Sequence, residues 1–453
     1  MNEVLQDGGV PAQVRRLLVD TWVREGDFLL AANLGRFDTV VGNPPYIRIE
    51  QLSPDLQSEY RRRFESLYDR ADLYVAFIQR GLDLLTANGT LSLICADRWT
   101  RNRYGSQLRR IVSERYRLKA YIDLNQASPF ESDVIAYPSI FALSPGESSN
   151  VFVAHLPTGN AEECAAVITA FHDSGVAPGI QSAIYDSWFA GEEPWVLGSP
   201  EHLAILRKLE ADFTTLEGDG KTRVGIGIAS GNDKVYIVPE GADIEADRLL
   251  PLVMRSDIEK GQIQNAHRCV INTFEGNGGV IDLRRYPRLS AYFEKHAEVV
   301  RKRHVAQRSG DGWFRTIDRA YPALVPKPKL LIPDIAGSNE VTFDEGHYHP
   351  HHNLYFVTSD SWDLEVLGGL LSSRVALYFI WSYATKMRGG YLRFQAQYLR
   401  RIRVPDPAKL SPAIAEGLRN AFRSRDFTKL DSLAMRAYQL KTIPDFEFVD
   451  TRA

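Results

Sequence analysis

Apolar runs and segments of helical periodicity alternate over the first third of the chain. We assign strands to five runs, at residues 26–30, 37–42, 89–97, 118–124 and 137–144. Residues 54–86 and 104–116 have the 3.6-residue periodicity of helices that bury one face. Strands separated by helices of this length pack as a mostly parallel, doubly wound sheet. The sequence therefore predicts an α/β fold for this part of the chain.

The pattern changes near residue 200. From about residue 220 onward, short apolar runs such as "RVGIGIASGNDKVYIVP" and "KPKLLIPDIAG" are separated by turn residues, which is typical of an antiparallel or mixed sheet. We expect helices at residues 201–211, 362–383 and 411–438. A chain of 453 residues also exceeds what one hydrophobic core usually serves. We therefore predict an α/β domain at residues 1–198 and a mixed α+β domain at residues 199–453.

Composition excludes several classes of protein. No window reaches about 18 uninterrupted apolar residues, so no membrane span is expected. The first 30 residues carry acidic side chains and no continuous apolar core, unlike a signal peptide. Cys95, Cys164 and Cys269 are too far apart for a zinc ribbon or a disulfide framework, which predicts a cytoplasmic protein. With a net charge of -3, any nucleic-acid binding must come from local basic patches.

One short motif has a composition that a simple turn does not need. The apolar strand Phe37–Val41 is followed by Gly42 and then by Asn43, Pro44, Pro45 and Tyr46. A turn uses Gly or Asn and one Pro, but it does not need two prolines followed by an aromatic residue. The motif therefore predicts a shaped site at the end of this strand.

This motif resembles motif IV of the amino-directed DNA methyltransferases, and more of the chain is similar to the TaqI-like, gamma-class enzymes. "EGDFLL" resembles their motif III, and "ADRWTRNRYGSQLRR" resembles the loop and helix after the next strand. Beyond residue 220, "VGIGIASGNDKVYIV" and "MRGGYLRFQAQYLRRIRVP" are similar to their target-recognition domain. The resemblance implies a restriction-modification enzyme that transfers a methyl group from S-adenosylmethionine to N6 of a flipped adenine in double-stranded DNA.

The residue types of the motif suit this chemistry. The adenine amine is a poor nucleophile, and acceptors at its two N–H bonds localise its lone pair as the methyl arrives. Asn43 can supply a side-chain carbonyl and Pro44 a backbone carbonyl, whose direction Pro45 restricts. Tyr46 offers a flat face for a flipped base. For the second aromatic of the family's sandwich we assign Phe141, with Tyr137 and Phe130 behind it, although an aromatic residue in a strand is as often core.

The cofactor half of the family's sheet is not evident in the sequence. Members carry a glycine-rich motif on a strand upstream of motif IV, whereas here the sole glycine pair before Asn43, Gly8-Gly9, is not preceded by a strand. We therefore expect an incomplete Rossmann-like methyltransferase sheet. A second polypeptide supplying the cofactor motif, a truncated or misassigned start, and a chain that kept only DNA binding are the three explanations. In the completed enzyme Asp27 and Phe28 would contact the cofactor; alternatively, Asp27 is a turn carboxylate.

Basic residues beside glycines and aromatics are candidates for DNA phosphate contacts. Arginines cluster at residues 98–110 after a predicted strand, at the sheet edge where ligands bind in doubly wound folds. Two further basic stretches lie in the second domain, although any one charge run is more often a solvated surface. The assigned DNA-binding residues are Arg101, Arg103, Arg301, Lys302, Arg303, Lys386, Arg388 and Arg393.

Three other interpretations remain open. The chain can be a non-catalytic DNA-recognition subunit of a restriction or phage-defence complex, or a methyltransferase that acts on cytosine N4 or on RNA. The stretch "GHYHPHHN" at residues 346–353 raises a metal site, but apart from Asp344 and Glu345 no carboxylate or cysteine set lies nearby at ligand spacing. We therefore assign no metal and expect a polar loop there.

Overall fold

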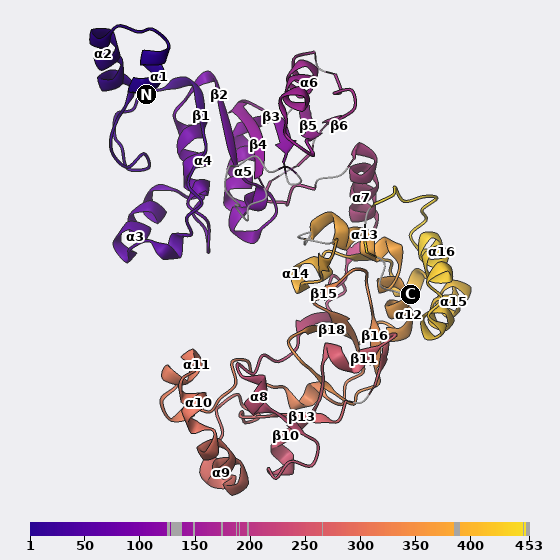
Figure 1. Cartoon of the computed structure of the whole chain (residues 1–453). Helices are drawn as coiled ribbons and strands as arrows, with labels where there is room; N and C mark the ends of the chain where they lie inside the picture. The colour runs from indigo at the N-terminus through magenta and orange to yellow at the C-terminus, as the bar shows by residue number, and fades with distance from the viewer. Residues whose placement is uncertain are drawn as a thin grey trace. The chain divides into compact units, whose positions relative to one another are not determined.

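A computed structural model of the chain divides into two compact units, Met1–Pro200 and Glu201–Ala453 (Figure 1). It describes residues 1–124, 127, 138–147, 150–173, 175–186, 188–189, 191–196, 199–264, 266–384, 390–446 and 448–449. The two units coincide with the two stretches of different strand pattern in the sequence, and each is described by itself below.

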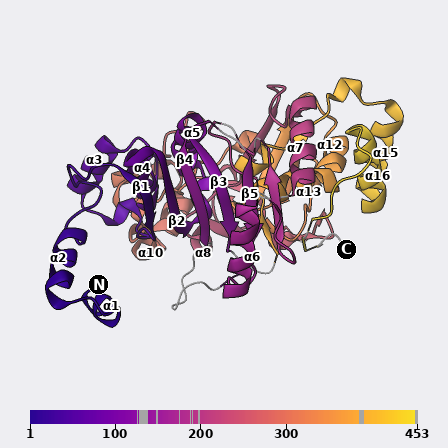
Figure 2. The same cartoon turned by 90° about the horizontal axis from the view of Figure 1, so that it is seen from above.

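The first unit is built on a six-stranded sheet with the order β1-β2-β4-β3-β5-β6. Figure 2 shows β1, β2, β4, β3 and β5 side by side in that order. The strands are β1 (Phe37–Gly42), β2 (Leu85–Ala96), β3 (Tyr116–Asp123), β4 (Pro138–Pro145), β5 (Val151–His155) and β6 (Gln181–Tyr185). Strands β1, β2, β3 and β5 run in one direction, as expected for a mostly parallel sheet, although only the β1·β2 and β3·β5 pairs are direct parallel neighbours. The reason is β4, which runs antiparallel between β2 and β3.

Helices bury their apolar faces on this sheet. These are α4 (Tyr74–Asp83), α5 (Ser106–Arg115) and α6 (Ala161–His172). On α4 the buried positions include Val75, Ile78 and Leu82, which follow helical spacing. A side chain at Gly81 would stand 2.7 Å from Leu91 Cδ1, so glycine is needed for α4 to approach β2 this closely. This packing fixes β1 and the loop that follows it.

Two predicted elements of the first unit differ in the structure. The predicted helix over 54–86 is two helices, α3 (Pro54–Arg63) and α4, because Ser53 caps the first and the chain turns between Phe64 and Leu73. The predicted strand at 26–30 contains a turn over residues 28–30 instead. Asp27 directs that turn, since its carboxylate accepts hydrogen bonds from the backbone of Leu29 and Leu30. Before it lie α1 (Asn2–Asp7) and α2 (Ala12–Trp22), neither of which buries a residue.

The second unit contains two four-stranded sheets, as the turn-rich pattern predicted. One has the order β17-β10-β13-β9 and the other β16-β14-β18-β8. Their strands are β8 (Thr222–Ile226), β9 (Ile237–Pro239), β10 (Leu249–Val253), β13 (Arg268–Ile271), β14 (Lys329–Pro333), β16 (Thr342–Asp344), β17 (His349–Pro350) and β18 (Leu354–Ser359). Every pair is antiparallel except β10·β17. Three two-stranded sheets are formed by β7 (Thr214–Thr215), β11 (Ile258–Glu259), β12 (Gln262–Ile263), β15 (Ile335–Ala336), β19 (Leu392–Arg393) and β20 (Arg403–Val404).

Helices complete the second unit. They include α7 (Pro200–Asp212), α8 (Asp233–Tyr236), α9 (Pro287–Lys295), α10 (Ala297–Arg301), α11 (His304–Gln307) and α14 (Ala396–Leu399). The predicted helix over 362–383 is broken into α12 (Leu364–Leu371) and α13 (Arg374–Tyr383), because Ser373 caps α13. The predicted helix over 411–438 likewise splits into α15 (Pro412–Ser424) and α16 (Phe427–Ala437) at the left-handed Arg425.

The helices α12 and α13 are the most apolar in the chain. Among the described residues no single helix is long and apolar enough to cross a membrane. Only together do α12 and α13 have that length and composition, and they meet at a bend of 58°. Every residue of α13 after Arg374 is buried within the unit, and all but one residue of α12 is buried. Their apolar surface therefore belongs to the core of the second unit.

Candidate active site and DNA-binding surface

The Asn-Pro-Pro-Tyr motif begins directly after the last residue of β1. Asn43 is exposed, Pro44 is buried, and Pro45 and Tyr46 are half-buried. β1 is an edge strand of the sheet, and its Val41 side chain is 73% exposed. The motif thus places the Asn43 amide and the Tyr46 ring at the end of a strand, with the buried Pro44 holding the segment between them in the protein.

Backbone hydrogen bonds fix the chain on the other side of the motif. The Leu73 N–H donates to the Ile47 carbonyl at 2.7 Å, and the Ile49 N–H donates to the Ala71 carbonyl at 3.4 Å. Between them Arg48 and Asp72 form an antiparallel bridge. The motif is therefore held at both ends, by β1 and by the segment that leads into α4, which limits the movement of its carbonyl groups.

The Tyr46 ring lies against Tyr74, with centroids 6.2 Å apart. The fully buried Tyr74 shares a 2.8 Å hydrogen bond between hydroxyls with Tyr104. Burial, with a smaller contribution from Cys95, raises the pKa of Tyr46 to about 12, so the phenol stays neutral at physiological pH. Sequence reasoning missed Tyr74 and Tyr104, because nothing in their spacing ties them to the motif.

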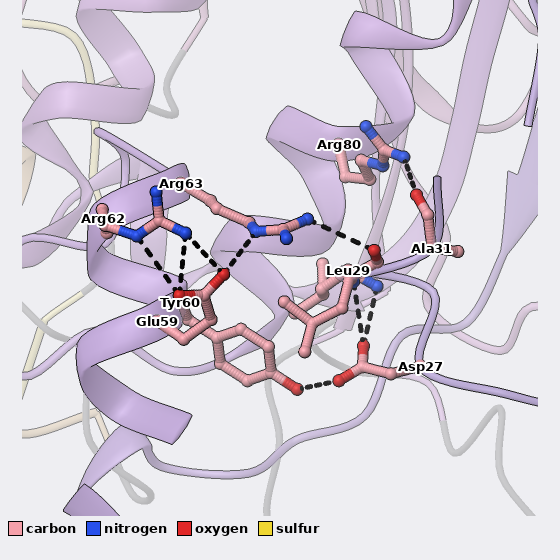
Figure 3. A network of polar contacts seen from close by, with 9 residues as sticks. Asp27, Leu29, Ala31, Glu59, Tyr60, Arg62, Arg63 and Arg80 are labelled. Carbon is pink, nitrogen blue, oxygen red and sulfur yellow. Dashed lines mark hydrogen bonds and ion pairs between the residues drawn. The ribbon is translucent and has the colours of Figure 1, made fainter. Parts of the chain in front are cut away.

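The turn that contains Asp27 and Phe28 is anchored by α3 and α4 (Figure 3). Asp27 Oδ1 accepts from the Leu29 N–H at 2.8 Å, and Oδ2 accepts from the Tyr60 hydroxyl at 2.5 Å. Burial and this hydrogen bond raise the pKa of Tyr60 to about 12. Phe28 stacks on Phe77 at 5.4 Å. The structure thus fixes the Asp27 carboxylate as a turn residue, with lone pairs left to accept a further hydrogen bond.

Two arginines of α3 and α4 hold the end of the same turn. Arg63 Nη1 donates to the Leu30 carbonyl at 3.2 Å, and Arg80 Nη2 donates to the Ala31 carbonyl at 2.6 Å (Figure 3). Neither arginine was singled out from the sequence, because a basic residue on a helix gives no sign of which loop it contacts. Together with Tyr60 they give the turn a fixed backbone path.

Phe141 does not occupy the position that the sequence assigned to it. Its side chain is 0% exposed and packs edge-on against Trp99, with centroids 5.5 Å apart. A ring buried on every side cannot also stack on a base, so Phe141 is a core residue. Tyr137 and Phe130, named with it, lie outside the described residues.

The arginines after β2 have different environments. Arg103 is exposed and lies 5.8 Å over the Tyr68 ring, while its Nη2 donates to the Tyr68 hydroxyl at 3.0 Å. Arg101 is half-buried, 3.7 Å from the Asp97 carboxylate. Arg109 is buried and donates to the carbonyls of Trp99 and Asn102. Arg109 therefore holds the loop in shape, and Arg103 is the cation among these three that faces solvent.

The basic stretch at α10 contains one structural arginine. Arg303 is half-buried, and burial lowers the pKa of its guanidinium. Lys302 is exposed, and its Nζ lies 2.7 Å from the Glu298 carboxylate. The Arg301 guanidinium lies over the Trp313 ring at 3.9 Å. Arg303 faces the core of the second unit, whereas Lys302 faces solvent.

The remaining predicted DNA contacts lie near β19. Arg393 pairs in a bidentate manner with Asp334, with distances of 3.1 and 2.7 Å. Lys386 and Arg388 lie outside the described residues. Arg393 can therefore contact a phosphate only while its guanidinium is also paired with Asp334, or after that ion pair has broken.

Each of the two units contains a region that matches a known protein family. Residues 19–130 match the Eco57I restriction-modification methylase family, and residues 257–404 match the TaqI-like C-terminal specificity domain. The first match contains the Asn-Pro-Pro-Tyr motif and the Asp27 turn. The second match contains most of the second unit.

Whole-chain relatives extend this agreement. The chain is 42% identical over 452 residues to the Type II methyltransferase M.BstVI of Geobacillus stearothermophilus, covering 97% of this chain and 81% of that protein. It is 45% identical over 444 residues to the Type II methyltransferase M.PaeR7I of Pseudomonas aeruginosa, covering 96% and 76%. The fold is similar to that of the Type IIL restriction-modification enzyme MmeI in complex with DNA, with a TM-score of 0.61 at 12% identity, over 90% of this chain and 55% of that one. The chain therefore belongs to the TaqI-like, site-specific DNA methyltransferases of Type II restriction-modification systems.

Proposed function

We propose that the chain transfers a methyl group from S-adenosylmethionine to N6 of an adenine that is flipped out of double-stranded DNA. The observation that carries this proposal is the placement of Asn43 to Tyr46, directly after an edge strand and held by hydrogen bonds at its far side. Asn43 is exposed and can present its carbonyl to one amine N–H, and the Pro44 carbonyl accepts the other. Pro45 fixes the direction of the Pro44 carbonyl.

In this mechanism no general base is needed. The two carbonyl oxygens accept hydrogen bonds from the amine and stabilise the positive charge that develops on its nitrogen as the methyl group is transferred. The amine proton then leaves to solvent. Tyr46 stacks on the extruded base, which compensates for the stacking lost from the duplex. The buried Tyr74, which is hydrogen-bonded to the half-buried Tyr104, lies behind Tyr46 and keeps its ring from turning away.

S-adenosylmethionine is the methyl donor in this proposal, and Asp27 and Phe28 are the residues that contact it. The turn is held by Tyr60, so the Asp27 carboxylate has a fixed direction in which to accept a hydrogen bond. Phe28 stacked on Phe77 presents an apolar surface beside it. The cofactor supplies the electrophilic methyl group, and these residues bind and orient it.

We further propose that a second polypeptide carrying the glycine-rich cofactor motif adds a strand to the open edge of β1. An edge strand with a 73% exposed Val41 and a 42% exposed Phe37 leaves backbone groups and apolar surface available for pairing. The exposed Leu17 and Trp22 of α2 add to the apolar surface of this unit. Calorimetry of S-adenosylmethionine with the chain alone, and then with the product of the neighbouring reading frame, tests this: binding only in the mixture supports it, and equal binding by the chain alone contradicts it.

DNA contacts are proposed for each unit by itself: Arg103 and Arg101 in the first unit, and Lys302, Arg301, Arg393, Lys386 and Arg388 in the second. Arg103 and Lys302 are exposed cations whose partners, the Tyr68 hydroxyl and the Glu298 carboxylate, also lie at the surface, so a phosphate can replace those partners at small cost. Arg303 is left out because its hydrogen bonds are internal.

Transfer of labelled methyl from S-adenosylmethionine to duplex DNA, with the neighbouring gene product present, tests the proposed activity. We expect transfer by the wild type and none by Asn43→Ala, while both bind the duplex equally in a gel shift. Specific binding with no transfer by the wild type would instead identify a recognition-only subunit.

A further inference from the structure

Two adjacent histidines of the second unit converge with a carboxylate from a distant part of the sequence. One ligand atom each from Asp233, His351 and His352 lies within 4.8 Å of the other two. Asp233 is the first residue of α8, and the two histidines directly follow β17. The histidine-rich stretch stood out in the sequence, but Asp233 could not be connected with it, because it lies 118 positions from His351.

The backbone around His351 and His352 is hydrogen-bonded to the segment that precedes Asp233. The Ile228 N–H donates to the Pro350 carbonyl at 2.9 Å, and the His352 N–H donates to the Ile228 carbonyl at 3.0 Å. A Cβ at Gly227 would lie 2.2 Å from the His351 carbonyl oxygen, so this close approach requires glycine. The two segments therefore cannot drift apart without breaking backbone hydrogen bonds.

Asp233 is oriented by its own neighbours. The Ser230 hydroxyl donates to Asp233 Oδ1 at 2.6 Å, which leaves Oδ2 directed at the His351 Nε2, 3.1 Å away. Three residues later, the fully buried Tyr236 anchors α8 through a hydrogen bond from its hydroxyl to the Phe314 carbonyl. The carboxylate is thus preorganised by the fold, as ligands of bound ions are.

The two imidazoles are in unequal environments. His351 is only 3% exposed, and its Nδ1 has no hydrogen-bond partner among the described residues. His352 is exposed, and its ring centroid lies 4.1 Å from that of His351. A simple Asp–His hydrogen bond accounts for Asp233 and His351, but it does not account for a second imidazole brought to the same carboxylate.

We propose that Asp233, His351 and His352 bind one zinc ion. Two imidazoles and one carboxylate are a ligand set that zinc accepts, with the fourth tetrahedral position open to water. Magnesium and calcium are disfavoured because they need mainly oxygen ligands. The site lies at the surface on the side of His352 and Asp233, so an ion can enter. A bound ion would tie the 227–233 segment to the residues after β17, and this inference does not depend on the proposed methyl transfer.

The test is zinc titration of the full chain by calorimetry, after purification without a histidine tag and treatment with a chelator. We expect one equivalent to bind, and His352→Ala to weaken binding by at least about tenfold, since even the loss of residues that only hydrogen-bond to the ligands costs about 10- to 100-fold. His352 is the residue to change because its side chain is exposed and its loss leaves the core intact. The matched control is His347→Ala, which removes an exposed histidine of the same loop whose ring is 3.9 Å from Asp344 and outside the cluster.

Cobalt substitution adds a second readout. A tetrahedral site with nitrogen ligands should give visible absorption bands in the wild type and in His347→Ala, and Asp233→Asn and His352→Ala should lose them. Circular dichroism of each variant checks that it is folded. Zinc binding that is absent in the wild type, or that survives unchanged in folded His352→Ala and Asp233→Asn, would overturn the proposal.

Discussion

Replacing Arg303 by alanine should unfold the second unit more easily and should leave DNA contacts largely as they are. The guanidinium donates to the carbonyls of Ser230, Trp313 and Arg315 at 3.1, 3.2 and 2.8 Å. It also donates to the Tyr236 hydroxyl at 2.6 Å and lies over that ring at 4.7 Å. One side chain thus connects the turn before α8 with the loop after α11.

The expected loss follows from these contacts. Each hydrogen bond from a charged donor contributes about 1.5–3 kcal/mol net, and contributions that share one group do not add in full. Solvent also reaches the half-buried guanidinium, and water can satisfy part of what the substitution leaves unpaired. We therefore expect Arg303→Ala to lower the free energy of unfolding by about 3 kcal/mol. With a urea slope of about 1–3 kcal/mol per molar, the midpoint should fall by about 1 M or more.

The assay is urea unfolding followed by tryptophan fluorescence, beside DNA binding measured at several salt concentrations. The matched control is Lys302→Ala, one residue away, whose exposed ammonium pairs only at the surface with Glu298. Lys302→Ala should change the free energy of unfolding by less than about 0.5 kcal/mol. It should also reduce the steepness of the plot of log binding constant against log salt concentration by about 0.9. An unchanged midpoint for Arg303→Ala, with a lowered salt slope, would refute this assignment.

Three further predictions concern other parts of the chain. Tyr60→Phe removes the hydroxyl that orients Asp27, so titration of the complete enzyme should show S-adenosylmethionine binding weakened about 2- to 10-fold, and unchanged affinity would contradict this role. Burial lowers the pKa of His349 from 6.5 to about 4, so the fold favours its neutral form and its contribution to stability is full above pH 6.5. About 3 kcal/mol of unfolding free energy should be lost between pH 6.5 and pH 4, and His349→Gln should flatten this part of the denaturation profile; an equally steep profile would argue against it. Val41→Glu should leave the isolated chain's stability within about 0.5 kcal/mol, because the side chain is 73% exposed, yet it should prevent co-purification with the proposed second polypeptide; retained assembly would count against pairing at β1.

The sequence predicted the elements that local patterns determine. Strands β2 and β3 and helix α5 lie where apolar runs and helical spacing placed them, because these signals depend on residues close in the chain. The direction of β4 was not predictable in this way, since nothing in its own residues says whether it pairs parallel or antiparallel with β2. Breaks such as the one at Ser373 were also missed, because a serine cap inside an apolar run is a weak signal.

Side-chain environments were harder to predict than elements. Asn43 to Tyr46 stood out because four residues of uncommon types occur together, and that signal needs no tertiary information. The sequence assigned Arg303 to DNA and Phe141 to a flipped base, whereas the structure holds both inside the protein. An arginine that bonds to carbonyls and one that faces solvent look alike in sequence, as do core and stacking aromatics. Asp233 and the two histidines after β17 are a further case, since only the fold brings them together.

The measurement that tests the central claim most directly is the identity of the methylated base. Plasmid DNA would be isolated from cells that express the chain with its neighbouring gene product, digested to nucleosides and analysed by mass spectrometry, beside the same cells with Asn43→Ala. Our account predicts N6-methyladenine in the first sample and its loss in the second. N4-methylcytosine in place of N6-methyladenine, no new methylated base, or N6-methyladenine that persists in Asn43→Ala would contradict it.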